Sequence, residues 1–459
     1  MGSAFSRRRS IRAAAIALCA MLSPVIAYGA GYALLHATLL RSVPAANSRL
    51  SKPPETIRLV FSEQVVPELS QISLTAPDGK ATVLKVANDP HDVHILVGRV
   101  GELVGGPYKV VWRVLSADGH PVSGSFAFTL ESGTPAKLAP ASSSTGPASR
   151  DSGTGDTLTA SSGTPSTTDT KPIPVVASVL RGTGLGALMA GLGLLFFAVT
   201  AGESRKLAPK AVIVRLIAVG AILLIAHLIA WLYSISPTAG LSGDFVASVV
   251  GSTVGRIEIL RVALALLALL AIALARREIP ALILGGACLV VSGGVGHPAA
   301  IHPYLSVPAK MAHLLSASLW LGGLLWLMWL ARCDDSGCRR EASRVSSVAL
   351  ITVIAIFLTG SLETILFLNS PGDLIHSQYG KLVLAKFVGL VILVGYGAYN
   401  RLRLLPRLED PGTTTRLSRS VMQELVVVTF VILIGGFLAY VPTPPAPQSS
   451  LSALTGRSK

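Results

Sequence analysis

The sequence predicts a membrane protein with two structural parts, an N-terminal all-β domain and a C-terminal bundle of about eight transmembrane helices. Of its 459 residues, 51% are hydrophobic and 14% are charged, a balance typical of membrane proteins. Short β-prone runs separated by turn residues fill the region 36–131. Long apolar segments begin at Val175 and recur to about residue 445. These observations together place a soluble β-domain before a helical membrane domain.

Residues 1–29 have the pattern of an export signal. Four arginines lie among the first twelve residues, an apolar run follows, and small residues precede a cleavage point after Gly29. An uncleaved anchor helix is the alternative, although the apolar run is short for a membrane span. Export would place the following domain outside the cytoplasm.

The region 36–131 is predicted to be a small antiparallel sandwich or barrel of about seven strands. Runs such as TIRLVF at 56–61 are bounded by turn signals such as Pro-Asp-Gly at 77–79. In the run 108–115, large apolar residues alternate with Lys, Val, Arg and Leu, so one face can be buried. A second alternating run covers 123–130. We expect these last two strands to be adjacent because a short turn joins them.

That turn contains Asp118, Gly119 and His120. A carboxylate and an imidazole two residues apart at a strand end can bind one metal ion if a third donor arrives from elsewhere. The alternative is a polar hairpin tip with no bound ion. The domain 36–131 contains neither cysteine nor methionine. Any metal held there would therefore have only nitrogen and oxygen ligands.

Residues 132–172 are dominated by Ser, Thr, Gly, Pro and Ala. Such a segment buries too little apolar surface to fold, so we expect a flexible linker.

The membrane domain, 175–445, contains eight segments that approach the roughly 20 residues needed to cross a bilayer. Arginines and lysines gather after the odd-numbered segments, which predicts that those loops are cytoplasmic and that the β-domain and the C-terminus are periplasmic. The net charge of +15 therefore reflects membrane topology and gives no reason to expect a nucleic-acid partner. The expected spans are 175–199, 211–235, 257–275, 279–294, 311–331, 347–368, 380–400 and 421–441.

Histidines of the membrane domain gather toward the predicted outer side. Imidazole suits transition metals and is rarely placed in hydrocarbon without a role. The alternative is a hydrated ring in a loop, or a buried ring with a structural partner. We predict a relay of metal-binding histidines made of His227, His297, His302, His313 and His376. Three other polar groups lie within spans: Glu363 and Lys386, a candidate structural ion pair, and Glu424, a candidate helix cap.

Several motifs resemble known families. His36-Ala37, the segment Phe61-Ser62-Glu63 and the run WRVLSADGHP at 112–121 are similar to the periplasmic copper-binding protein CopC. In the membrane domain, Gly296-His297, HLL at 313–315 with WLGG at 320–323, YGK at 379–381 with Lys386, and Ser420-Val421 with Glu424 resemble CopD. The chain thus resembles a CopC–CopD fusion.

The resemblance implies a cupredoxin-like or immunoglobulin-like Greek-key barrel that binds Cu(II). It implies His36, Asp118 and His120 as ligands, with Glu63 as an additional or outer ligand. In CopC proteins the α-amine of the N-terminal histidine also binds the metal. Cleavage after Gly29 would remove that amine from the ligand set, and His91 or His94 could then complete it.

The expected function is Cu(II) binding in the periplasm and copper import or resistance at the bacterial inner membrane, without an enzymatic reaction and with no catalytic residues. The expected partners are copper ions, the lipid bilayer and other periplasmic copper carriers. One alternative is a haem-containing b-type membrane oxidoreductase acting on copper, since helix histidines can ligate haem. Another is a copper buffer whose membrane part only anchors it. No Walker motif is visible, so we infer no ATP coupling.

Overall fold

The computed structural model describes eleven stretches of the chain, which form two compact units, one mainly of strands and one mainly of helices. The predicted export signal and the predicted linker lie outside the described residues. The described stretches are 39–116, 119, 121–131, 175–201, 205–206, 208–236, 241–296, 303–330, 336–410, 412–441 and 443–444.

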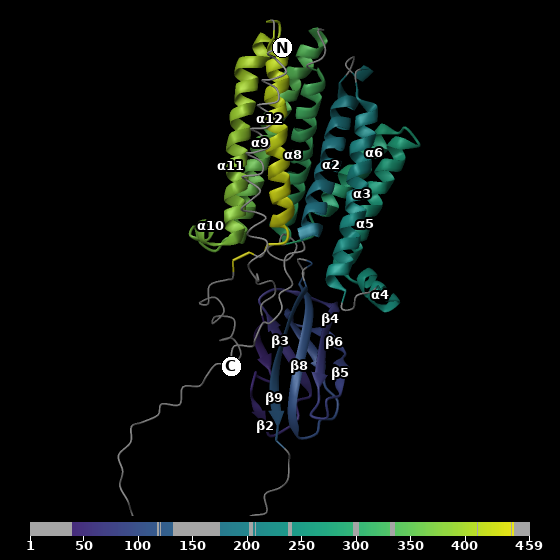
Figure 1. Ribbon diagram of the computed structural model, residues 1–459, viewed down its shortest axis with the longest axis vertical. Coiled ribbons are helices and arrows are strands. Elements are labelled where there is room, and N and C mark those ends of the chain that lie inside the picture. The colour runs from purple at the N-terminus through teal and green to yellow at the C-terminus, as the bar shows by residue number, and fades with distance from the viewer. Residues whose placement is uncertain are drawn as a thin grey trace, which may run out of the picture. The chain divides into compact units, whose positions relative to one another are not determined.

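The N-terminal unit is a two-sheet β-structure (Figure 1). One sheet has four strands in the order β1-β3-β7-β6, and the other has five in the order β2-β9-β8-β4-β5. Pairing is antiparallel within the first sheet, whereas β2 runs parallel to β9. The strands are β1 (Leu39–Val43), β2 (Arg49–Leu50), β3 (Thr56–Phe61), β4 (Val65–Thr75), β5 (Ala81–Leu84), β6 (Val86–Asp89), β7 (Asp92–Arg99), β8 (Gly106–Ser116) and β9 (Pro121–Leu130).

Alternating burial along the strands builds the core of this unit. In β3 every second residue is buried, and β8 and β9 show the same alternation over most of their length, as expected when one face of each strand packs against the other sheet. Phe61 and Trp112 meet edge to face with centroids 5.3 Å apart, and Tyr108 stacks on Phe128 at 5.4 Å. A Cβ at Gly124 would lie 2.5 Å from Trp112 Cζ2. Only glycine therefore leaves room for the indole ring.

The predicted all-β fold is confirmed, with one difference in the number of strands. The strand at 56–61 has the predicted bounds, and the runs 108–115 and 123–130 lie within β8 and β9, which are neighbours in one sheet. The structure has nine strands among the described residues, not about seven. The short strands β1 and β2 escaped prediction because two to five residues carry too little periodicity.

The C-terminal unit is a bundle of long helices (Figure 1). Helix α2 packs against α3 and α8, α8 against α9, α5 against α6, and α11 against α12. The helices are α2 (Val175–Thr200), α3 (Lys210–Ile235), α4 (Gly243–Gly251), α5 (Thr253–Ala273), α6 (Glu278–Ser292), α8 (Pro303–Leu330), α9 (Ser336–Phe367), α10 (Asp373–His376), α11 (Gln378–Tyr399) and α12 (Thr413–Leu438), with the short helices η2 (Asn400–Leu404) and η3 (Leu405–Arg407) between the last two.

Six helices in the described part of the chain are long and apolar enough to cross a membrane, so the predicted count of eight is not confirmed. The other two expected spans correspond to α5 and α6. Helix α6 has 15 residues and is about 22 Å long at 1.5 Å per residue, less than the ~30 Å hydrocarbon core. Helix α5 is longer but carries Arg256, Glu258 and Arg261. Helices α5 and α6 are consecutive. Whether both or neither are counted as membrane spans, every later helix crosses the membrane in the same predicted direction.

Glycines bring α2 and α8 into close contact. A Cβ at Gly193 would lie 1.9 Å from the Ser318 carbonyl oxygen, and one at Gly322 would lie 2.0 Å from the Gly193 carbonyl carbon. Helix backbones that approach this closely require small residues at the crossing. The glycines of the first span thus serve helix packing.

Candidate functional site

The Asp-Gly-His turn joins β8 to β9. Strand β8 ends at Ser116 and β9 begins at Pro121. Between them, Gly119 has a φ of +91°, which favours glycine, and its N–H donates to the Ser116 carbonyl at 2.8 Å. The tight turn is therefore observed. Asp118 and His120 lie outside the described residues, as does His36, so their ligand roles stay predictions.

Other candidate ligands of the β-domain are described. Glu63 lies two residues past β3 and is partly buried. His91 lies in the exposed β6–β7 turn, and His94 lies near the start of β7, where its Nδ1 is 2.8 Å from Asp92 Oδ1. This arrangement is that of a polar hairpin tip.

Asp89, which precedes this turn, is held by two hydrogen bonds. The His91 backbone N–H donates to its Oδ1 at 3.0 Å, and Arg58 Nη2 donates to its Oδ2 at 2.5 Å. Both bonds favour the ionised carboxylate, so they lower the pKa of Asp89 below its ordinary value of 3.8, with the backbone bond as the larger cause.

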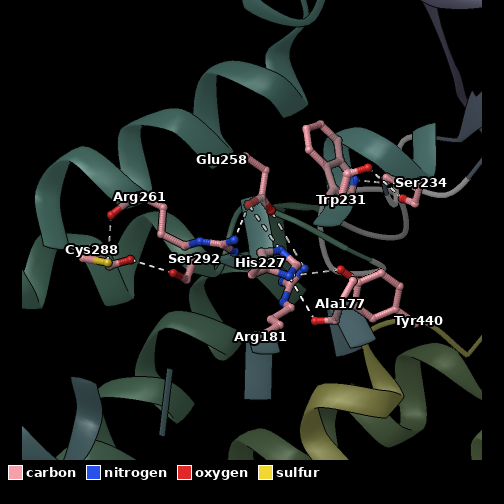
Figure 2. Close-up of polar contacts among 11 residues, drawn as sticks. Ala177, Arg181, His227, Trp231, Ser234, Glu258, Arg261, Cys288, Ser292 and Tyr440 are labelled. Carbon is pink, nitrogen blue, oxygen red and sulfur yellow. Dashed lines mark hydrogen bonds and ion pairs between the residues drawn. The ribbon is translucent and has the colours of Figure 1, made fainter. Parts of the chain in front are cut away.

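The helical unit contains a cluster of buried charged groups that the sequence analysis missed (Figure 2). Glu258 lies at its centre. Arg261 Nη2 donates to Glu258 Oε2, and Arg181 Nη1 lies 4.0 Å from Oε1. Tyr440 and His227 complete the cluster, with ring centroids 6.3 Å apart. The available signal was charge inside the first and third predicted spans, where Arg181, Glu258 and Arg261 interrupt apolar sequence.

His227 in α3 is fully buried within this cluster. Its Nδ1 lies 3.0 Å from the Ala177 carbonyl oxygen. Since a carbonyl only accepts, Nδ1 carries the hydrogen. In the neutral ring Nε2 then carries the lone pair, and it faces Glu258 Oε2 at 3.6 Å. The ring is therefore fixed among charged neighbours.

The charges of the cluster do not cancel. Two guanidinium groups surround one carboxylate, which leaves an excess positive charge when His227 is neutral. Arg261 Nε and Nη1 are buried and have no hydrogen-bond partner among the described residues. An excess of positive charge disfavours a metal cation at His227. The cluster instead ties α2, α3 and α5 together.

His313 in α8 has a different environment. Its Nδ1 lies 2.9 Å from Thr359 Oγ1, and the Thr359 hydroxyl donates to the Ala355 carbonyl at 2.7 Å. Because that hydroxyl hydrogen is already used, Thr359 accepts and His313 Nδ1 is the donor. Nε2 then keeps its lone pair, which is the form that binds a metal. The ring lines a cavity of about 390 Å³.

The predicted relay is not brought together as one site in the described residues. His297 and His302 lie outside them, and His376 ends the short helix α10. Within the described stretches, no group of three or more His, Cys, Asp or Glu residues could hold a metal ion.

The other polar groups expected within spans also have defined places. Glu363 and Lys386 line the same cavity as His313, but no ion pair joins them among the described contacts. Glu424 Oε1 accepts from Asn400 Nδ2, so this carboxylate bonds to the neighbouring helix η2 instead of capping its own.

An all-β domain in one chain with a bundle of long apolar helices, several of which carry buried ionisable groups, defines a two-part, multi-pass membrane protein. Known proteins agree with this. The CopC domain family model matches residues 39–131, and the CopD model, described as copper resistance protein D, matches residues 339–438.

Individual relatives cover both parts. The copper transport protein CutJ of Bacillus subtilis is 25% identical over 443 residues, which is 90% of this chain and 75% of CutJ. Copper resistance protein C of Escherichia coli is 33% identical over 109 residues, 22% of this chain and 84% of that protein. The crystal structure of CopC from Methylosinus trichosporium OB3b is 31% identical and covers 22% of this chain and 97% of that one, with a TM-score of 0.21. The chain belongs to the CopC family and is a CopC–CopD fusion.

Proposed function

We propose that this protein binds copper outside the cytoplasm and moves it across the bacterial inner membrane, in copper uptake or copper resistance. The observation that carries the proposal is the presence of a CopC domain and a CopD domain in one chain. In addition, 90% of this chain aligns with a copper transport protein. In this role the protein transports copper as its substrate and need not convert it chemically.

In this proposal the β-domain captures Cu(II). His36, Asp118 and His120 supply two imidazoles and a carboxylate, with Glu63 as an additional or outer ligand. A nitrogen and oxygen donor set suits Cu(II), and the described part of the domain offers no sulfur for Cu(I). The β8–β9 connection supports this because it is short: the Gly119 N–H donates to the Ser116 carbonyl within it, and Asp118 and His120 are two residues apart in the sequence.

The membrane domain then receives the ion. Six apolar helices support a multi-pass membrane location, and the distribution of basic residues supports a periplasmic β-domain and C-terminus. A linker of ~40 residues has a root-mean-square reach of roughly 30–40 Å. Tethering at that length keeps the captured ion near the helices at an effective concentration in the millimolar range.

Among the histidines of the membrane domain, the geometry favours His313 as a copper-receiving group. Its Nε2 lone pair is available at a cavity, whereas His227 is enclosed with an excess of positive charge. His297, His302 and His376 remain candidates for the entry path.

The test is copper binding and copper transport by the full-length protein. Cu(II) titration of the purified chain should show a tight site that His120→Ala weakens by at least about tenfold, since one strong ligand is lost. Glu102→Ala, which removes an exposed carboxylate of the same domain that belongs to none of the assigned ligand sets, is the control and should leave the affinity unchanged. Equal affinity in the wild type and in His120→Ala would remove the assigned site.

Transport is measured separately in proteoliposomes. His313→Ala should slow copper entry while the affinity of the β-domain stays the same. His227→Ala should change the stability of the helical unit more than the transport rate. If neither variant altered transport, the path would not use these imidazoles.

A further inference from the structure

A cavity of about 390 Å³ lies among helices of the membrane domain. Its walls come mainly from α8, α9, α11 and α12, with Leu374 contributed by the short helix α10. Apart from α8 and the first residues of α9, these helices fall within the region matched by the CopD family model. The α11 wall is one face of the helix, since Tyr379, Val383, Lys386 and Leu390 recur at spacings of three or four residues. The volume is that of a small-ligand site.

The rim of this cavity is apolar and lies on the outer surface of the helices. Phe357, Ile365 and Phe387 line the cavity and are also exposed, Ile365 by 74%. All three belong to helices long and apolar enough to span a membrane, so this surface faces lipid tails. A ligand would therefore enter laterally from the bilayer, and it must be lipophilic.

The interior nevertheless holds groups that need polar partners. Glu363 is only 8% exposed, and its Oε1 has no hydrogen-bond partner in the described part of the chain. The Lys386 side chain lines the same cavity, as does His313, whose Nε2 keeps its lone pair. Burying a polar group without a hydrogen-bond partner is unfavourable, and more so when the group is charged. The carboxylate oxygen Oε1, buried and without a partner among the described residues, thus points to a bound ligand.

The chemistry of the lining narrows the class of that ligand. A bare acyl chain would leave Glu363 unsatisfied. A phosphate headgroup would place its negative charge near the carboxylate. A neutral ring that both donates and accepts hydrogen bonds satisfies Glu363 and Lys386 together, and an aromatic ring packs well between Phe357 and Phe387.

We propose that this cavity binds a quinol of the bilayer, with one ring hydroxyl donating to Glu363, a ring oxygen accepting from Lys386, and the isoprenoid tail leaving between Phe357 and Phe387. The proposal goes beyond copper carriage and does not depend on it. The residues assigned to the quinol belong to α9 and α11, and no copper ligand of the β-domain takes part. His313 of α8, the proposed copper-receiving group, lines the same cavity but is assigned no contact with the quinol.

The experiment uses the full-length protein in nanodiscs of quinone-free phosphatidylcholine, without copper and without oxygen. A decyl-tailed dimethoxy-methyl-benzohydroquinone is titrated and its binding is followed by calorimetry. The same compound with both hydroxyls methylated is the comparison ligand, because it keeps the ring and the tail but cannot donate. We expect saturable binding of the quinol at one site per chain and at least about tenfold weaker binding of the dimethyl ether, the loss expected for a hydrogen bond to a charged group.

Two variants and one control locate the site. Glu363→Gln should weaken quinol binding by at least about tenfold. Gly360→Leu should abolish it, since the Gly360 Cβ direction points into the cavity toward His313 Cε1 at 3.6 Å. Glu424→Gln is the control. It removes another buried carboxylate, which bonds to Asn400 and does not line the cavity, so this variant should bind the quinol as tightly as the wild type. Equal binding of quinol and ether would indicate an acyl-chain groove and overturn the proposal. Unchanged binding in both cavity variants would overturn it as well.

Discussion

His227 Nε2 lies 3.6 Å from Glu258 Oε2, and both side chains are almost completely buried among three helices. This approach joins α3 to α5, and Arg181 extends the link to α2 (Figure 2). The carboxylate is therefore the negative centre that holds three helices together.

Replacing that carboxylate should destabilise the helical unit. Glu258→Gln leaves Arg181 and Arg261 buried without a counter-charge, and removing one partner of a buried ion pair typically costs about 3–5 kcal/mol. Thermal unfolding of the full-length protein in detergent measures the effect. Glu278→Gln is the matched control because its partners Arg205 and Lys210 are exposed, and a surface pair is worth roughly 1 kcal/mol or less. Equal losses in the two variants would contradict the role of the cluster.

Trp112 should be sensitive to a single added methyl group in the β-domain. Gly124→Ala places a Cβ 2.5 Å from the indole, and overpacking of this kind typically costs about 1–3 kcal/mol. The loss of stability is measured by chemical denaturation of the full-length protein, with hydrogen exchange of the β-domain amides as the signal. Gly101→Ala is the control, since its Cβ would meet nothing within 4 Å. A Gly124→Ala variant as stable as Gly101→Ala would mean that the ring can move aside.

The crossing of α2 and α8 should depend on Gly193. Here an added Cβ meets a backbone oxygen, Ser318 O at 1.9 Å, so the helices must separate and lose their packing. We expect Gly193→Ala to lower the unfolding temperature in detergent. Gly397→Ala in α11, where nothing lies within 4 Å, should be neutral or stabilising by up to ~1 kcal/mol through helix propensity. The prediction fails if the two alanine variants unfold at the same temperature.

Asp89 should make the β6–β7 hairpin sensitive to acid. Its folded pKa lies below the ordinary value of 3.8 because the His91 N–H and Arg58 stabilise the carboxylate. Its contribution to stability is thus complete above that ordinary value and is lost as the pH falls through the lowered folded pKa. Hydrogen exchange of the β6–β7 amides, corrected for intrinsic rates, should show this loss of protection in the wild type and a flatter dependence in Asp89→Asn. The same acid dependence in both proteins would exclude Asp89 as its source.

Local sequence determined the secondary structure and the family. Alternation along 108–115 and 123–130 specified two adjacent strands because side chains on a strand point to opposite faces every second residue. Apolar length specified the long helices, since a bilayer demands about 20 such residues. The motif around Asp118 and His120 identified the CopC family without any coordinates, because the residues that carry the resemblance lie within one short segment of the chain.

Only the tertiary structure decided which distant residues meet. Arg181, His227 and Glu258 belong to three different helices, and their contact follows from helix packing that no short sequence pattern encodes. The structure separated His227, enclosed by charge, from His313, whose Nε2 is available at a cavity. It also showed that Glu363 and Lys386 share that cavity without pairing. The physical reason is that periodicity fixes which face of a helix is apolar, while the rotation and crossing of helices fix what each buried polar group can reach.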